Sequence, residues 1–124
     1  MKVLIVDDSA AIRLKLRNFL TSLGHTVVGE AANGVEAIEL FKKSNPDFVT
    51  MDLVMPQMGG LEAMIEILAI RPKANVAVVT SAGTAQIKKD VQQAGACYFL
   101  QKPFTKEAVK TMITETEKKL SKAA

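Results

Sequence analysis

The sequence predicts an α/β fold, a doubly wound parallel sheet of five strands with five helices, in a single domain spanning residues 1–124. Short apolar runs alternate with stretches of helical periodicity along the whole chain, the pattern of βαβ units whose sheet is covered on both faces. Most of the runs contain β-branched or aromatic residues. With 124 residues, 48% hydrophobic and 23% charged, the chain has the size and composition of one globular core.

The five strands are the short apolar runs, and most of them end at turn or charged residues. The first is Val3-Leu4-Ile5-Val6, which stops at an acid pair. Because strands of this kind join through right-handed crossovers, consecutive runs build one open sheet with helices on both faces. The expected strands cover residues 2–6, 26–30, 48–52, 75–80 and 97–101.

The first two helices are predicted from caps and apolar stripes. The helix at about 9–23 begins at a Ser9 cap, and its inward side chains are spaced by threes and fours before Gly24. The next follows Asn33-Gly34 and stops before Pro46. Their inward residues are expected to be Ile12, Leu16, Phe19, Leu20 and Leu23 in the first helix, and Ile38 and Phe41 in the second.

Three more helices follow the same spacing. The third ends before Arg71-Pro72, the shorter fourth ends before Gly95, and the fifth begins at Thr105. Their inward stripes are predicted to be Leu61, Met64, Ile65 and Leu68; then Ile87, Val91 and Ala94; then Val109, Met112, Ile113 and Leu120.

Composition restricts the compartment. No apolar stretch approaches the roughly 18 residues needed to span a bilayer, so no membrane partner is expected. The lone Cys97 cannot form an internal disulfide and is expected to be a small core residue. The single His25 has no Cys or second His with which to bind zinc. A cytoplasmic protein is therefore predicted.

Charge is uneven along the chain. Residues 1–70 carry six basic and nine acidic side chains, whereas residues 71–124 carry ten basic and four acidic ones. The lysines of the second half lack interleaved aromatic residues or a DNA-reading motif, so no nucleic-acid partner is expected. Two interpretations stay open: a solvated helix face, or a surface for an acidic protein partner.

Four charged residues follow predicted strands directly: Asp7 and Asp8 after the first, Asp52 at the end of the third and Lys102 after the fifth. Because the carboxyl ends of parallel strands gather at one edge of a sheet, these side chains could share a site. Three carboxylates repel one another unless protons or a cation intervene. Oxygen ligands suit Mg²⁺. Each residue taken alone could have a purely structural role, such as a helix cap or a surface charge.

This constellation suits phosphoryl transfer to a carboxylate. A carboxylate can act as the nucleophile and form an acyl phosphate. A metal ion and the ammonium group of Lys102 would stabilise the charge on the transferring group. Thr80, at the end of the fourth strand, offers a hydroxyl donor to the same oxygens. The set therefore indicates phosphoryl acceptance.

Four motifs resemble those of response-regulator receiver domains, in the same order and spacing over nearly the whole chain, and most of all those of stand-alone chemotaxis regulators. They are Val-Leu-Ile-Val-Asp-Asp-Ser at 3–9, Met-Asp-Leu-Val-Met-Pro-Gln-Met-Gly-Gly at 51–60, Val-Val-Thr-Ser-Ala at 78–82 and Leu-Gln-Lys-Pro-Phe at 100–104. The resemblance implies the strand order 2-1-3-4-5.

The resemblance also assigns roles. It implies that Asp52 is the phosphoacceptor and that Mg²⁺, or Mn²⁺ in its place, binds Asp7, Asp8, Asp52 and the backbone carbonyl of Val54. Thr80, Lys102 and Phe99 would form the phosphoryl-binding and switch set. A cis peptide bond would precede Pro103. Val54 and Ala82 would tune the lifetime of the acyl phosphate. Where many relatives have tyrosine, Phe99 lacks a hydroxyl group.

The function implied is that of a single-domain response regulator of a two-component system. It would accept a phosphoryl group from a histidine kinase and, as a monomer, bind a target such as a flagellar motor switch or a phosphatase, through the fourth helix, fifth strand and fifth helix. It would catalyse only its own phosphorylation and dephosphorylation. Alternatives are a phosphorelay shuttle, an excised receiver of a larger regulator, an unphosphorylated interaction module and, from another class, a flavodoxin-like cofactor binder. Asp7-Asp8-Ser9 disfavours the last, because acids there would repel a phosphate.

Overall fold

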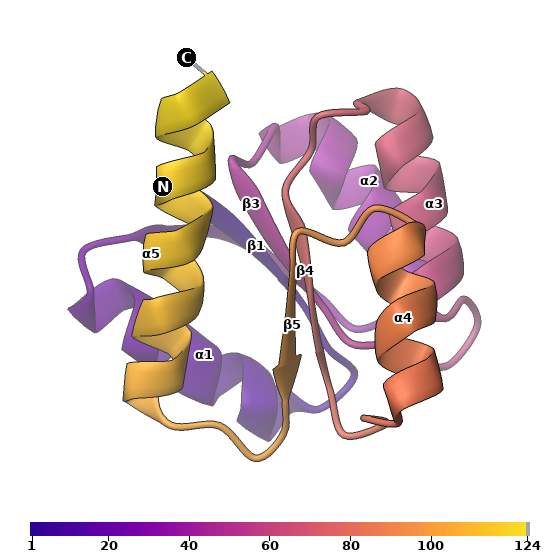
Figure 1. Cartoon of the computed structure of the whole chain (residues 1–124), viewed down its shortest axis with the longest axis horizontal. Helices are drawn as coiled ribbons and strands as arrows, with labels where there is room; N and C mark the ends of the chain where they lie inside the picture. The colour runs from indigo at the N-terminus through magenta and orange to yellow at the C-terminus, as the bar shows by residue number, and fades with distance from the viewer. Residues whose placement is uncertain (124) are drawn as a thin grey trace.

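A parallel sheet of five strands forms the centre of the molecule (Figure 1). The computed structural model describes residues 1–123, with side chains up to Leu120. The strands stand in the order β2-β1-β3-β4-β5, and every neighbouring pair is parallel. The predicted fold class and strand order are confirmed. The strands are β1 (Lys2–Val6), β2 (Thr26–Ala31), β3 (Phe48–Met51), β4 (Val76–Thr80) and β5 (Tyr98–Gln101).

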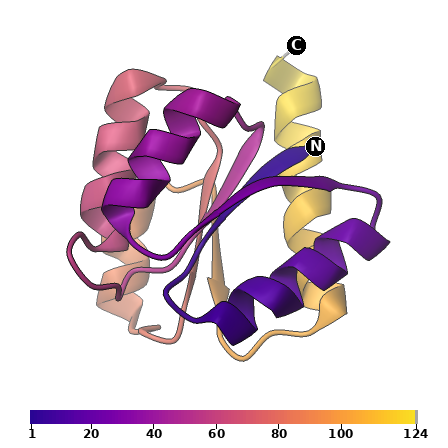
Figure 2. The same ribbon diagram turned by 180° about the vertical axis from the view of Figure 1, so that it is seen from behind.

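Helices cover both faces of the sheet. One face carries α1 (Ala10–Ser22) and α5 (Lys106–Ala123), and the other carries α2 (Gly34–Ser44), α3 (Gly60–Ile70) and α4 (Ala85–Gln93) (Figures 1 and 2). Ser9 caps α1 as predicted, because its hydroxyl accepts the Ile12 N–H at 3.3 Å. Among residues 1–123, no helix has the length and apolarity needed to cross a membrane.

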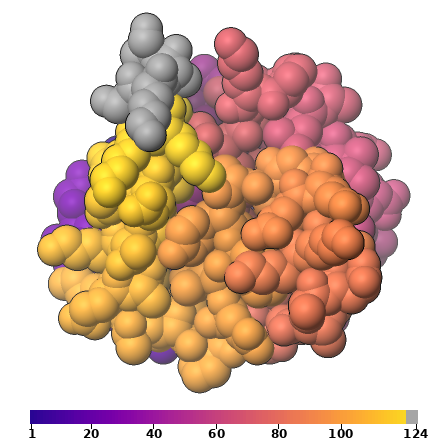
Figure 3. Space-filling model, viewed as in Figure 1, coloured from indigo at the N-terminus to yellow at the C-terminus, as the bar shows by residue number. Residues whose placement is uncertain are grey.

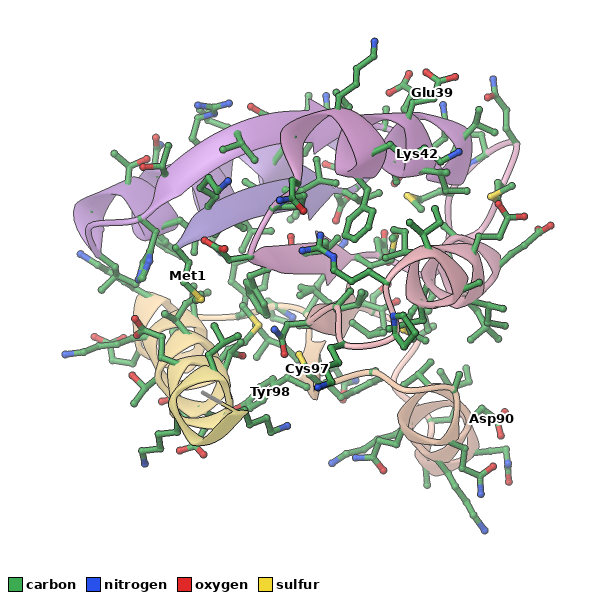
Figure 4. All side chains as sticks on the ribbon, turned by 90° about the horizontal axis from the view of Figure 1, so that it is seen from above. Met1, Glu39, Lys42, Asp90, Cys97 and Tyr98 are labelled. Atoms are coloured by element: carbon green, nitrogen blue, oxygen red, sulfur yellow. The ribbon has the colours of Figure 1, made fainter. Side chains whose placement is uncertain are left out.

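The core divides into two layers because alternate side chains of a strand point to opposite faces. In β1, Val3 and Ile5 pack under α1 and α5, whereas Leu4 and Val6 pack under α2, α3 and α4. All four are buried. Cys97 packs half-buried against the first of these layers and lies with Tyr98 between α4 and α5 (Figure 4).

The stripe predicted for α3 is wrong in part. Met64 is fully buried as expected, but Leu61 and Ile65 are 38% and 53% exposed, and Ala63 and Ile67 fill the core instead. Apolar residues surround most of this helix, so periodicity alone does not select the buried side. The inward face is set by packing against α2 and the sheet.

One buried hydroxyl gives a stability prediction. Thr50 lies in the middle of β3, is 1% exposed, and its hydroxyl has no hydrogen-bond partner among the described residues. An unpaired buried hydroxyl costs about 1–3 kcal/mol. We expect Thr50→Val, which keeps the side-chain shape, to raise the free energy of unfolding by about 1 kcal/mol in urea denaturation.

Thr116 provides the matched control. It is also 1% exposed, but its hydroxyl donates to the Met112 carbonyl oxygen at 2.9 Å. Thr116→Val should therefore give no gain. Equal gains at both positions would show that the missing partner of Thr50 is not the cause.

Candidate functional site

Three carboxylates meet at the carboxyl edge of the sheet. Asp7 and Asp8 follow β1, and Asp52 follows β3, the neighbouring strand. The Asp52 N–H donates to the Val6 carbonyl oxygen at 3.0 Å, which holds the two strand ends together. One ligand oxygen from each of the three acids lies within 4.8 Å of the others. The structure thus brings together the acids that the sequence placed at strand ends.

Lys102 lies among these carboxylates. It follows β5, two strands away from β3, and its backbone N–H donates to the Thr80 carbonyl oxygen at 2.9 Å. The Nζ atom is 2.6 Å from Asp7 Oδ2 and 3.2 Å from Asp52 Oδ2. The sequence placed Lys102 beside the transferring group, and the structure pairs it with both acids, with the shorter contact to Asp7. The Lys102–Pro103 peptide bond is cis.

Burial sets the electrostatics of the site. Asp7 is 1% exposed, and this burial raises the pKa of its carboxyl group although Lys102 and the Ser9 N–H both stabilise the carboxylate. Burial alone would lower the pKa of Lys102, but its hydrogen bond to Asp7 and the charges of Asp7 and Asp52 outweigh that effect and raise it. One ammonium group faces three carboxylates, so the site is left with an excess of negative charge.

The donors fit a hard divalent cation. All three are carboxylates, and neither His nor Cys belongs to the cluster. Backbone N–H groups orient two of them: Ser9 donates to Asp7 Oδ1 at 2.9 Å, and Leu53 donates to Asp52 Oδ1 at 2.8 Å. Mg²⁺ uses few carboxylates and keeps several waters, which suits a cluster with one exposed member, Asp8. The part of the Val54 carbonyl as a ligand stays a prediction.

The remaining predicted residues lie on β4, on β5 and in the loop after Asp52. Thr80 is fully buried at the end of β4, and its hydroxyl oxygen accepts the Ala82 N–H at 3.2 Å. Phe99 is half-buried in β5, with the Lys88 ammonium 6.0 Å from its ring centre. Val54 is 66% exposed in the loop after Asp52. Their switching and tuning roles stay predictions.

Gly60 shapes the loop that follows Asp52, a role that reasoning from residue types missed. A Cβ atom there would lie 1.9 Å from the Asp52 carbonyl oxygen, and the Gly60 N–H donates to the Leu53 carbonyl oxygen at 3.0 Å. The loop after β3 therefore folds back tightly under Asp52, which only glycine permits. The Gly-Gly pair at 59–60 was the available signal.

Comparison with known proteins agrees with this geometry. The family model described as response regulator receiver domain matches residues 3–114. The chain is 41% identical to the chemotaxis protein CheY of Thermotoga maritima, over 94% of this chain and 98% of that protein. It is 40% identical to CheY of Bacillus subtilis, over 93% and 96%.

Among solved structures, a similar one is the crystal structure of the CheX–CheY–BeF3–Mg²⁺ complex from Borrelia burgdorferi. The match has a TM-score of 0.90 and 34% identity, and it covers 92% of this chain and 87% of the other.

Proposed function

This chain belongs to the response regulator receiver domain family, and we propose that it is a single-domain, CheY-like switch that accepts a phosphoryl group on Asp52. The observation that carries the proposal is the position of Asp52. Asp52 is 6% exposed, and its carboxylate lies beside two further acids and is 3.2 Å from an ammonium group. A carboxylate so placed is a nucleophile with its charge-stabilising partners already assembled.

The chain's own residues divide the chemistry. Asp7, Asp8 and Asp52 would hold Mg²⁺, which when bound offsets the negative charge of the acids and of the incoming phosphoryl oxygens. An oxygen of Asp52 attacks the phosphorus atom, the bond to the donor's leaving group breaks, and an acyl phosphate forms. Lys102 then pairs with a phosphoryl oxygen, and the Thr80 hydroxyl donates to another.

A mass measurement tests this function. The protein is incubated with Mg²⁺ and a small phosphodonor, and its intact mass is recorded. We expect one added phosphoryl group on the native protein, none after chelation of the metal, and none in Asp52→Asn. An undiminished adduct in Asp52→Asn, or none on the native protein, would contradict the proposal.

The output surface is proposed to be the face formed by α4, β5 and α5 (Figure 3). These elements carry exposed lysines, which are Lys88 and Lys89 of α4 and Lys106, Lys110, Lys118 and Lys119 of α5. Half-buried Phe99 in β5 connects this face with the strand end that bears Lys102.

A histidine kinase would supply the phosphoryl group in the cytoplasm. An acidic segment of a flagellar motor switch or of a phosphatase would dock on the lysines, most readily in chemotaxis. The similar Borrelia structure is a complex of CheY with CheX, BeF3 and Mg²⁺, which supports the proposal that this chain binds Mg²⁺ and docks on a protein partner.

The acyl phosphate is expected to be long-lived. Val54 and Ala82 have apolar side chains, which cannot orient an attacking water by hydrogen bonding. We expect Ala82→Glu and Val54→Asn to change the decay rate of the phosphorylated protein at least several-fold, measured by loss of the mass adduct. Ala85→Glu, an exposed position at the start of α4, is the control and should decay like the native protein. Unchanged decay in both test variants would contradict the tuning role.

A further inference from the structure

Arg13 connects α1 to the acidic site. Its Nη1 atom donates to the Asp7 backbone carbonyl oxygen at 2.6 Å, and its Nε atom donates to Glu30 Oε1 at 3.2 Å. Its side chain is 19% exposed. Glu30 lies next to the end of β2 and also accepts from Arg17, at 2.7 Å. The Arg13 guanidinium group is therefore held from one side by Glu30 while it binds the peptide group that joins Asp7 to Asp8.

The three acids are not held equally. The Asp7 carboxylate accepts from Ser9 and Lys102, and the Asp52 carboxylate accepts from Leu53 and Lys102. The exposed Asp8 carboxylate has no hydrogen-bond partner among the residues whose side chains are described. No side-chain hydrogen bond orients it, so its position depends on its backbone, and a contact that fixes the Asp7–Asp8 peptide helps to aim Asp8.

Both polar groups of Asp7's backbone are fixed. The Asp7 N–H donates to the Ala31 carbonyl oxygen at 3.0 Å, and its C=O accepts from Arg13. From these contacts we infer that Arg13, oriented by Glu30, is a positioning residue for the cation site and acts by aiming Asp8. This inference rests on the proposed function, since it assumes that the acids bind a divalent cation.

The sign of the effect separates positioning from charge. A guanidinium group near three carboxylates repels a dication, so if its charge alone mattered, removing it would tighten binding. If Arg13 positions Asp8, removing it weakens binding, because partners of ligand residues commonly contribute 10- to 100-fold to metal affinity. The two explanations predict opposite results for one substitution.

The test is calorimetric titration of the full chain with Mg²⁺. We expect Arg13→Ala to weaken Mg²⁺ binding roughly ten-fold, at the lower end because the contact is through the backbone. Arg17→Ala is the matched control: it removes the same charge from the same Glu30 but has no contact with Asp7, and its affinity should stay within about two-fold of the native value. Arg13→Lys keeps the charge but lacks the planar fork that reaches both partners, so it should recover only part of the loss.

A second measurement detects positioning directly. In the metal-free protein, the amide resonance of Asp8 reports the peptide whose carbonyl oxygen Arg13 binds. We expect Arg13→Ala to shift this resonance and Arg17→Ala to leave it in place. If Arg13→Ala does not fold, the Arg13→Lys variant answers both questions.

Unchanged or tighter Mg²⁺ binding in a folded Arg13 variant would overturn the inference, as would an equal loss in Arg17→Ala. Either result would leave the proposed function intact. If the native protein itself binds no Mg²⁺, the proposed function fails.

Discussion

Replacing Lys102 with methionine is expected to lower the free energy of unfolding of the metal-free protein by about 3 kcal/mol at pH 7. The Lys102 ammonium is 2.6 Å from Asp7 and 3.2 Å from Asp52, and both carboxylates are buried. Removing one partner of such a group leaves uncompensated buried charge, which costs more than the pair contributes. Urea denaturation in the presence of a chelator measures the change.

The loss of stability in Lys102→Met should depend on pH. The folded-state pKa of Lys102 is raised above 10.5, so its contribution is fully present below that pH and disappears as the pH rises through the folded value. At acid pH, the difference in free energy of unfolding between the native protein and Lys102→Met should become smaller, because Asp7 takes up a proton below its raised pKa. Lys110→Met, at an exposed position on α5, is the control and should change stability by no more than about 0.5 kcal/mol.

Mg²⁺ should restore part of the stability that Lys102→Met loses. In the native protein a metal ion must share Asp7 Oδ2 with the ammonium group, whereas in Lys102→Met that competition is absent. We therefore expect Mg²⁺ to bind the variant several-fold more tightly and to stabilise it more than it stabilises the native protein. A variant as stable as the native protein without metal, or one that binds Mg²⁺ more weakly, would contradict this account.

The sequence was sufficient to predict the layout of the fold and which charged residues meet at one edge of the sheet. Strands that are buried on both faces appear in the sequence as apolar runs. Because the sheet is parallel, the carboxyl ends of these strands lie at one edge, and this places Asp7, Asp8, Asp52 and Lys102 there. Periodicity was not sufficient for α3, where apolar residues occupy most of the circumference. Leu61 and Ile65 are exposed, and only packing against α2 and the sheet decides which side of the helix is buried.

Contacts that depend on long side chains were also beyond the sequence. Lys102 and Asp7 are 95 positions apart, and nothing in the residue pattern indicates that their contact is shorter than the one with Asp52. The same holds for Arg13, which the residue pattern does not connect with the acids. Its hydrogen bond to a backbone carbonyl appears only once α1 and β2 are packed beside β1.

Asp7→Asn is expected to stabilise the metal-free protein and to abolish most of its affinity for Mg²⁺. Burial raises the pKa of Asp7 in spite of Lys102, which means that the folded state disfavours the charged carboxylate at pH 7. A neutral amide of the same shape removes that cost, and we expect a gain of roughly 1 kcal/mol, the size common when a functional site is relieved. The loss of one of three carboxylates should weaken Mg²⁺ binding on the order of 100-fold.

The pH and metal dependence make this prediction specific. A group with a raised folded-state pKa contributes stability that is fully present below its unfolded value, here 3.8, and is lost as the pH rises through the folded value. The higher metal-free stability expected of Asp7→Asn should therefore disappear as the pH falls toward 3.8. At pH 7, Mg²⁺ at many times the dissociation constant of the native protein should reverse the order of stability, because the native protein gains more binding free energy than the variant. Asp8→Asn is the control: its carboxylate is exposed, so it should lose Mg²⁺ affinity without gaining comparable metal-free stability. If Asp7→Asn is less stable than the native protein without metal at pH 7, the prediction is wrong. The attraction between Lys102 and the Asp7 carboxylate would then exceed the cost of burying that carboxylate, and the cation would have no such cost to offset.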